Sequence, residues 1–486
     1  WWSQRLVDDL IRCKTLIIVA NASIVNESKI QGGKRMFKKK GFLLIICLIM
    51  MLGLVACSKS NESSQDNSAT NEPTTNESKT DDEVVTLKFL HWISEDVAHW
   101  EDIIAIYEAE NPGVKIESTP LVNNNSAPDY MKKLDLLASA GEEMDLIMFN
   151  NIADYVKRID AGLLAPINSF LEQEGVDVES EYINSYPAID GQYYGLPMKA
   201  NVNLIMLNKQ HLDEARLEIP TDWTWDDYRE YAKAMTTPEH YGSYLHSWHH
   251  FHSLLKLLGD PDNPTMFKED GSSNLGHPLV RESLELRYQL EQVDKSSVPY
   301  VETLSQQLNY RQQFLTGQAS MIPTGSFMIT EWGEFSPDFE IAWAPWPKND
   351  PNGEIYANVS GDVIGIAESS KHKEEAYHFM RWLTTEGIVQ QGIWLPSWKG
   401  DGDGDFVTII EKLVQNAPKP EVIHIESLTH TLSVSNPPKI VVPPSYSYEV
   451  GTVFGAEVDL YLLGEQDLDT TMKNAIEKVQ DLIDAN

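Results

Sequence analysis

Strand-like and helix-like hydrophobic patterns alternate along residues 84–164, and this alternation limits the possible folds more than any other feature of the chain. The stretch VVTLKFLHW (84–92) alternates and is rich in β-branched residues, as strands are. Apolar residues at helical spacing follow from Val97 to Tyr107, and Asn111-Pro112-Gly113 ends them. The next segments are an expected strand (114–119), helix (130–143), buried strand (145–149) and helix (152–164). This order predicts an α/β fold with a mostly parallel sheet covered by helices.

Polar and aromatic side chains follow two strands of this expected sheet. Trp92 comes directly after the first strand, and Asn150 and Asn151 follow the third. Sheets of this kind bind ligands at the carboxyl ends of their strands. We therefore expect Trp92, Asn150 and Asn151 to line a ligand site. Core packing of the tryptophan and ordinary turn formation by the asparagines are the competing interpretations.

A secretory signal is indicated at residues 36–56. Lysines 38–40, an apolar run from Phe42 to Leu52 and the tripeptide Leu-Val-Ala before Cys57 have the order of such signals. The ending resembles the bacterial lipobox, which implies that Cys57 carries lipid and anchors the mature chain to the membrane. An uncleaved anchor is the alternative, although the run is short for a span of about 20 residues. Residues 1–35 precede the signal, and we interpret them as a spurious upstream extension.

The mature chain starts with a polar stretch. Residues 57–83 are rich in Ser, Asn, Thr and Glu and predict a disordered tether. Cys13 and Cys47 precede Cys57, so the mature domain has no disulfide and no thiolate metal site. Residues 1–56 hold nine basic and three acidic residues, so the net charge of −35 becomes −41 without them. This charge argues against nucleic acid as a partner.

Five blocks of sequence resemble, in the same order, the extracellular solute-binding proteins of bacterial sugar ABC importers, the relatives of maltose-binding protein. The blocks are YEAENPGVKIE (107–117), KLDLLASAGEEMDLIMF (133–149), IDGQYYGLPMKANVNLIMLNKQHLDEARLEIPTDWTWDDY (189–228), FLTGQASMIPTGSF (314–327) and SSKHKEEAYHFMRWLTTE (369–386). The resemblance implies a two-lobe, periplasmic-binding-protein-like fold of type II, with a ligand cleft between the lobes.

The same resemblance implies that the chain crosses between the lobes more than once. We place the first crossing in Tyr194–Asn203 and the return in Ile341–Pro347. Crossing segments are natural hinges, because a few residues can absorb the change in backbone angles on closure. The predicted parts are residues 84–198 and 344–400 for lobe 1, and residues 199–343 and mainly 401–486 for lobe 2.

Sugar sites combine aromatic faces with a few polar groups that fix hydroxyls. The resemblance points to Asn201 after the first crossing, to Trp248 and to Phe327. The predicted site also includes Trp343 beside the return, Gly361 for close backbone approach, Asp362 as a hydroxyl acceptor, Trp394 as a stacking wall and His249 or His250 as a hydroxyl partner. Core packing is the alternative for Trp394, and a turn cap is the alternative for Asp362. Lys199 either faces an acidic sugar or is solvated.

The stretch SYLHSWHHFH (243–252) raises the question of a metal. On a helix His246, His249 and His250 would share one face, so a site is geometrically possible. No thiolate and no HExxH motif supports it, and we predict neither metal nor cofactor. The stretch KGDGDGDF (399–406) fails the EF-hand pattern, because Phe406 and Lys412 occupy the positions that need Gly and Glu.

The expected function is that of a monomeric, lipid-anchored component of an ABC importer on the outer face of the bacterial membrane. It would capture a carbohydrate, which we expect to be an oligosaccharide, by hinge closure and deliver it to the permease subunits. We find no P-loop, G-x-S-x-G or H-E-x-x-H motif that would argue for an enzyme. A receptor for a non-sugar solute and a surface polysaccharide-degrading enzyme remain the alternatives.

Overall fold

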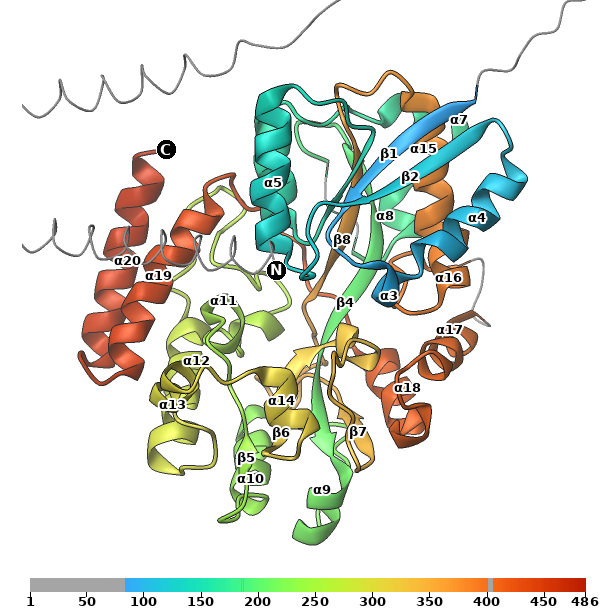
Figure 1. Ribbon diagram of the computed structural model, residues 1–486. Helices are drawn as coiled ribbons and strands as arrows, with labels where there is room; N and C mark the ends of the chain where they lie inside the picture. The colour runs from blue at the N-terminus through green and yellow to red at the C-terminus, as the bar shows by residue number, and fades with distance from the viewer. Residues whose placement is uncertain (1–83, 185, 187, 401–404) are drawn as a thin grey trace, which may run out of the picture. The chain divides into compact units, whose positions relative to one another are not determined.

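The alternating pattern at the start of the folded chain forms parallel strands joined by helices (Figure 1). The computed structural model of the protein describes residues 84–184, 186, 188–400 and 405–486. Its first elements are β1 (Val85–His91), α3 (Glu95–Ala98), α4 (Trp100–Glu110), β2 (Val114–Pro120), α5 (Ala127–Ala140), β3 (Leu146–Phe149), α6 (Ile152–Asp160), α7 (Asn168–Glu174) and α8 (Val178–Glu181). Strand β1 pairs in parallel with both β2 and β3, so the predicted α/β class is confirmed.

The rest of the described chain contributes five strands and many helices. The strands are β4 (Gly195–Asn208), β5 (Tyr241–Ser243), β6 (Ala319–Gly325), β7 (Ile341–Ala344) and β8 (Val359–Ile366). The α-helices are α9 (Lys209–Ala215), α10 (Trp225–Ala234), α11 (His249–His252), α12 (Pro278–Tyr288), α13 (Tyr300–Ser305), α14 (Tyr310–Leu315), α15 (Lys373–Trp382), α16 (Ile388–Gln391), α17 (Asp405–Gln415), α18 (Ile425–Val434), α19 (Ser447–Leu462) and α20 (Leu468–Asp484). The short 3₁₀ turn η3 (Ser326–Ile329) follows β6.

One long strand, β4, links two parts of the sheet. The strand order is β2-β1-β3-β8-β4-β6-β5, and β7 also pairs with β4. The first half of β4 pairs antiparallel with β8, and its second half, from Asn203 on, pairs with β6. Strand β8 in turn pairs with β3 through its last four residues. Strands β4 and β8 therefore run from one part of the fold into the other (Figure 1).

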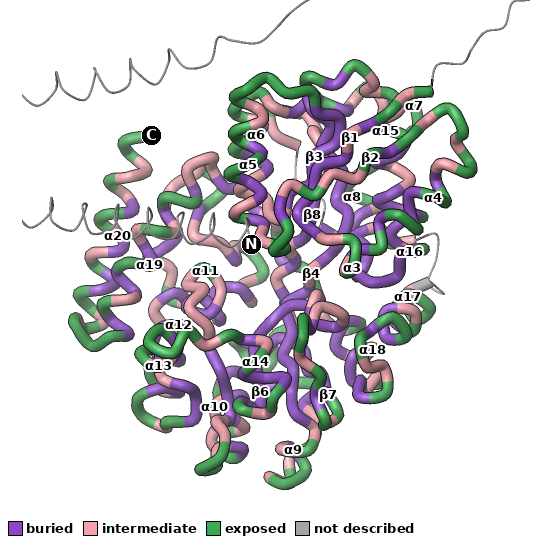
Figure 2. The backbone as a smooth tube through the Cα atoms, in the orientation of Figure 1, coloured by how far each residue is buried: buried purple, intermediate pink, exposed green. Residues whose placement is uncertain are grey.

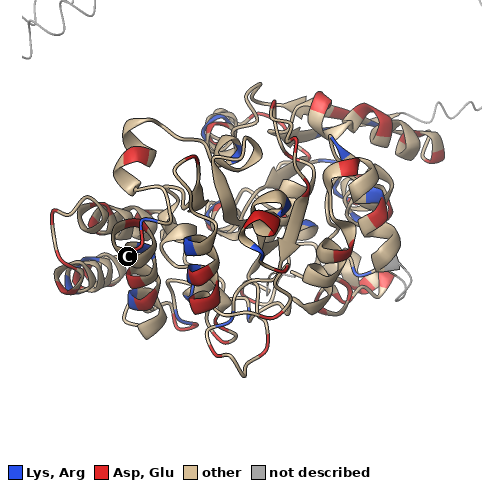
Figure 3. Cartoon of the chain, turned by 90° about the horizontal axis from the view of Figure 1, so that it is seen from below, with Lys and Arg blue, Asp and Glu red and all other residues tan. Residues whose placement is uncertain are grey.

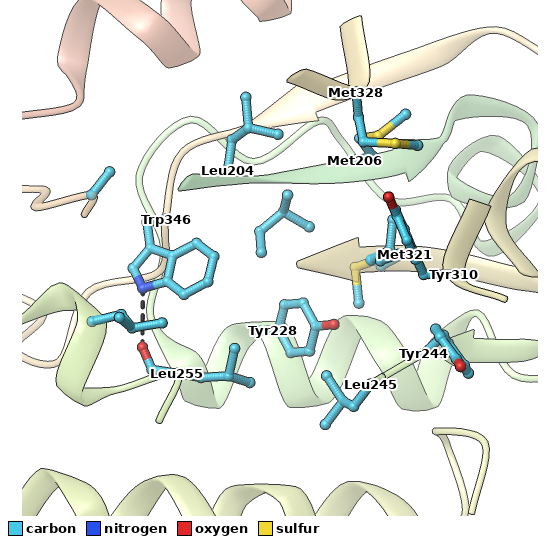
Figure 4. Packing of buried hydrophobic residues seen from close by; sticks show 14 of the residues in the cluster. Leu204, Met206, Tyr228, Tyr244, Leu245, Leu255, Tyr310, Met321, Met328 and Trp346 are labelled. Atoms are coloured by element: carbon cyan, nitrogen blue, oxygen red, sulfur yellow. Dashed lines mark hydrogen bonds between the residues drawn. The ribbon is translucent and has the colours of Figure 1, made fainter. Parts of the chain in front are cut away.

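Two separate hydrophobic cores lie at the two ends of this strand pair. The first core takes its residues from 87–198 and 363–394, and the second from 200–359 and 395–479. Figure 2 shows most of the strands buried, the edge strand β2 largely uncovered, and the outer faces of the helices exposed. In the second core the indole Nε1 of Trp346 donates to Leu255 O (3.1 Å) beside Tyr228 (Figure 4). This division is the two-lobe arrangement that the resemblance implies.

The return from the second core comes later than the predicted boundary at residue 344. Trp343 and Trp346 are both fully buried in the second core, and so is Ala357. The reason is that β7 pairs with the second half of β4 and so belongs to that part of the sheet. The chain returns to the first core only within β8, between Val359 and Val363.

A third segment pairs with β4 where the cores meet. Ala200 N donates to Leu395 O (2.8 Å), and Ser397 N donates to Met198 O (2.9 Å). The chain passes from the first core to the second again at this point, since Trp394 belongs to the first core and Leu395 to the second. Three hydrogen-bonded segments therefore join the lobes, and we call them the hinge segments (residues 198–203, 359–363 and 394–397).

Some predictions lie outside the described residues. They are the extension (1–35), the signal (36–56), the tether with Cys57 (57–83) and most of the aspartate-rich loop at 401–404. Within the described part of the chain, no helix combines the length and apolarity that a membrane span needs. Acidic side chains are spread over several of the helices in Figure 3, in keeping with the strongly negative net charge.

We predict that Gly361→Ala destabilises the protein by about 2 kcal/mol or more, because overpacking a tight site has a cost of this size. A Cβ at Gly361 would lie 1.8 Å from Lys199 O and 2.6 Å from Asn184 Nδ2. Urea unfolding measures the change. The matched control is Gly113→Ala, because a Cβ there meets nothing within 4 Å. Equal stability of the two variants would contradict this prediction and show that the backbone around Gly361 shifts without cost to accept a Cβ.

A second prediction concerns pH. His91 is fully buried, and burial lowers its pKa to about 4 from an ordinary value of 6.5. Below pH 6.5 the unfolded chain binds a proton that the folded protein does not, so stability falls as the pH falls towards 4. For this group the loss between pH 7 and pH 5 is about 2 kcal/mol. Urea unfolding at both pH values should give a smaller loss in His91→Gln, and an unchanged loss would contradict the assignment.

Candidate functional site

A group of buried charges lies on the hinge segments. Lys199 in β4 and Asp362 in β8 are register partners, and Lys199 Nζ lies 3.2 Å from Asp362 Oδ2. Lys199 Nζ is also 3.3 Å from Glu331 Oε1, just beyond η3. Both residues of the Lys199–Asp362 pair are buried, with Lys199 5% and Asp362 2% exposed. The predicted hydroxyl acceptor Asp362 is therefore already the partner of Lys199.

The environment shifts the pKa values of this pair. Burial raises the pKa of Asp362 to about 6, and the neighbouring Lys199 ammonium opposes that rise. Burial would lower the pKa of Lys199, but the carboxylates of Asp362 and Glu331 outweigh it and raise that pKa. Lys199 therefore stays charged at neutral pH, and it is neither solvated nor unpaired.

Glu331 connects this pair to further residues. Its Oε1 accepts a hydrogen bond from Trp394 Nε1 (3.0 Å), and Lys199 Nζ lies 4.8 Å from the centroid of the same indole. Arg311 Nε donates to the backbone oxygen of Glu331 (2.7 Å), and its guanidinium is 3.5 Å from Glu331 Oε2. Because Trp394 belongs to the first core and Glu331 lies in the second lobe, these contacts bridge the lobes.

Three aromatic side chains adjoin the charges. The ring centroids of Trp248 and Tyr310 are 4.7 Å apart, and those of Tyr310 and Phe327 are 6.4 Å apart. The Arg311 guanidinium lies 4.8 Å from the Tyr310 ring centroid, which joins the aromatic group to the charged one. Trp248 and Phe327 are partly exposed, so both keep surface for a ligand. We call Trp248, Tyr310 and Phe327 the aromatic group.

Asn201 is fixed next to this group by the turn that carries Phe327. Ser326 Oγ donates to Ala200 O (3.1 Å) and accepts from Val202 N (3.1 Å), one residue on either side of Asn201. The half-buried side chain of Asn201 makes no hydrogen bond to any described residue. Its amide is therefore available to a ligand at the edge of the aromatic group.

A hollow of about 460 Å³ is lined in part by His246, the neighbour of Trp248. His246 contacts Trp248 edge to face, with ring centroids 5.0 Å apart. The lining is mixed, with hydroxyl, amide and aliphatic groups, and consists of His246, Ser247, Thr303, Leu304, Gln307, Leu308 and Asn309. This composition suits a hydroxylated ligand with apolar faces.

The lobe 1 residues predicted from strand ends serve local structure. Trp92 is 7% exposed and packs on Tyr130, with ring centroids 5.5 Å apart. Asn151 caps α6, because its Oδ1 accepts from Asp154 N (2.8 Å) and its Nδ2 donates to Asn150 Oδ1 (2.9 Å). Among the described residues no hydrogen bond, ion pair or ring contact joins Trp92, Asn150 or Asn151 to the hinge charges.

Two further predictions need correction. Trp343 is fully buried in β7 and cannot stack on a ligand there. His249 Nε2 contacts Asp459 Oδ1 (2.8 Å) and Tyr300 OH (3.1 Å), so the ring ties α11 to α19 instead of facing a solute. Gly361 allows a close approach of β4, because a Cβ there would lie 1.8 Å from the Lys199 carbonyl oxygen.

The helix face on which His246, His249 and His250 would lie together does not form. Helix α11 begins only at His249, and His246 lies before it with Nδ1 2.8 Å from Tyr244 OH. His252 turns its Nε2 to Pro323 O (3.2 Å). The described residues hold no group of three His, Cys, Asp or Glu side chains placed to bind a metal ion.

Residues that sequence reasoning missed complete the site. Tyr310, Arg311 and Glu331 carry the link between aromatic and charged groups, yet none belongs to a motif. Glu331 follows Phe327 by four residues, and on a helical turn this spacing could have indicated that the two side chains share one face. Trp248, Phe327, Asn201, Asp362 and Trp394 are the predicted residues that the structure brings together.

The comparisons with known proteins agree with this fold. The multiple sugar-binding protein of Streptococcus mutans is 25% identical over 378 residues, which are 73% of this chain and 80% of that protein. The arabinooligosaccharide-binding protein of Halalkalibacterium halodurans is 22% identical over 426 residues, covering 82% and 89%. The structure of a Listeria monocytogenes ABC substrate-binding protein in complex with cycloalternan gives a TM-score of 0.64 at 19% identity, covering 82% of this chain and 98% of that one.

A family profile identifies the chain more directly than any single relative. The profile described as bacterial extracellular solute-binding protein matches residues 92–390, which is more than half of the sequence and spans both cores and all of β4 and β8. The chain belongs to the bacterial extracellular solute-binding protein family.

Proposed function

We propose that this protein captures an oligosaccharide at the hinge segments and delivers it to the permease of an ABC importer. The observation that carries the proposal is the aromatic group beside paired charges and the unbonded Asn201 amide. Aromatic faces pack on the C–H faces of sugar rings, and polar groups fix the hydroxyls. The sugar-binding names of two relatives support the same ligand class.

The hollow beside His246 supports a ligand longer than one ring. Its volume of about 460 Å³ lies within the range of small-molecule sites, about 300–1,000 Å³. His246 lines the hollow and contacts Trp248, so a chain of rings that starts on the aromatic group can extend past His246 into the hollow. The hydroxyl and amide groups of Ser247, Gln307 and Asn309 then meet sugar hydroxyls.

Ligand binding acts through the three hinge segments. A solute that contacts both lobes stabilises the closed form and shifts the population towards it. The bridge from Trp394 to Glu331 shows that groups of the two lobes reach each other here. Closure around a bound solute, without chemical turnover, is the mechanism that this geometry supports.

Calorimetry against malto-, cello-, xylo- and arabino-oligosaccharides of two to six rings tests the proposal. We expect one series to bind with an affinity that rises with length up to a plateau, because added rings fill the hollow. A reducing-end assay on the same mixtures should detect no product. Binding of no member, or release of shorter sugars, would contradict the proposal.

We predict that Trp248→Ala lowers the affinity for that oligosaccharide at least tenfold, because loss of a stacking face removes about 1.4 kcal/mol or more. The matched control is Tyr448→Ala, which removes an aromatic ring that is 77% exposed on α19. Calorimetry measures both, with thermal unfolding as a check of the fold. An unchanged affinity in Trp248→Ala would place the sugar elsewhere.

We also propose that the mature protein is a monomer held on the outer face of the cell membrane by lipid on Cys57. The support is the signal pattern that ends at Cys57. The wild type should fractionate with membranes, and Cys57→Ser should not acquire labelled palmitate. Labelling of that variant would mean that another residue carries the lipid.

A further inference from the structure

Among the described residues, the charged side chains beside the aromatic group have partners of opposite sign. Lys199 pairs with Asp362 at 3.2 Å and with Glu331 at 3.3 Å. Arg311 pairs with Glu331 at 3.5 Å. The four groups hold two positive and two negative formal charges, so their sum is zero.

Arg287, a further cation near the site, also has a carboxylate partner. Arg287 lies near His246, where its charge helps to lower the histidine pKa after the larger effect of burial. Arg287 Nε is 2.7 Å from Glu291 Oε1, and both side chains are fully buried. Each of the described cations near the aromatic group, Lys199, Arg311 and Arg287, is therefore already paired with a carboxylate.

The charge balance of the site depends on Glu331, because this carboxylate pairs with both Lys199 and Arg311. It accepts from Trp394 Nε1 at 3.0 Å as well, so its position is fixed from three sides. Asp362 is buried behind it and pairs with Lys199 alone. Removal of the Glu331 charge would leave Arg311 unpaired beside the Tyr310 ring, at a site with a net charge of about one positive unit.

We infer that the site selects an uncharged oligosaccharide, and that Glu331 is the residue that excludes acidic sugars. A sugar carboxylate here must face the carboxylates of Glu331 and Asp362, while the cations that would bind it are already paired. Like charges at close range in a partly buried site cost more than in water, because the effective dielectric constant is lower. A neutral sugar finds an acceptor in the partly exposed Glu331 carboxylate and donors in Arg311 and Asn201. This inference rests on the proposed function and deepens it by naming the charge of the ligand.

The test compares matched neutral and acidic probes by calorimetry. The neutral probe is the member of the panel that binds the wild type, and the acidic probes are trigalacturonate and a xylo-oligosaccharide with a glucuronic acid branch. In the wild type we expect the acidic probes to bind at least tenfold more weakly than the neutral one. In Glu331→Gln we expect the ratio of acidic to neutral affinity to rise at least tenfold, and the gain to shrink at high salt.

Glu334→Gln is the matched control, since it removes the same charge from an exposed position three residues away and should leave the ratio unchanged. Glu331→Ala makes the same charge change with a smaller side chain, and thermal unfolding shows which variants are folded. The wild-type comparison needs no variant at all.

The outcomes separate the two claims. Equal or tighter binding of an acidic probe by the wild type overturns the inference and leaves the proposed function intact. An unchanged ratio in the folded Glu331 variants overturns the role of Glu331. Binding of neither probe class overturns the proposed function, and the inference with it.

Discussion

The antiparallel pairing of β4 with β8 is the interaction on which the rest of the structure depends. Both strands leave one hydrophobic core and enter the other, so their hydrogen bonds hold the two lobes in register. The Lys199–Asp362 ion pair joins the strands at the crossing point. Loss of one member of such a buried pair would leave the other charge uncompensated, at about 3–5 kcal/mol. Gly361 allows the strands to come close enough, since a side chain there would overlap the Lys199 carbonyl.

The proposed site grows directly out of this crossing. Ser326 bonds the backbone on both sides of Asn201, and so brings the turn with Phe327 against β4. Arg311 then links the Tyr310 ring to Glu331, and Glu331 links the second lobe to Trp394 of the first core. In the proposed site, a ligand held by the aromatic group would contact the same residues that connect the lobes. This geometry would couple ligand recognition to lobe closure.

Local patterns in the sequence were sufficient to predict the first strands and helices of the first lobe and part of the site. The alternation up to residue 164 predicted the strands and helices that form, because each is set by its own periodicity. Asn201 and Phe327 could be proposed from the resemblance. The role of Glu331 could not, because its partner Lys199 lies 132 residues away and nothing local marks the pair. Trp343 and His249 were misjudged because an aromatic or a histidine near a crossing looks the same in sequence whether it faces a solute or the core.

A crystal structure of the protein with the oligosaccharide identified by calorimetry tests the central claim most directly. We predict one sugar ring on Trp248 and Phe327, with hydroxyls bonded to Asn201 and within reach of the Lys199–Asp362–Glu331 charges, and the next ring in the hollow beside His246. Density for the sugar on any other surface, with the aromatic group uncovered, would contradict the account.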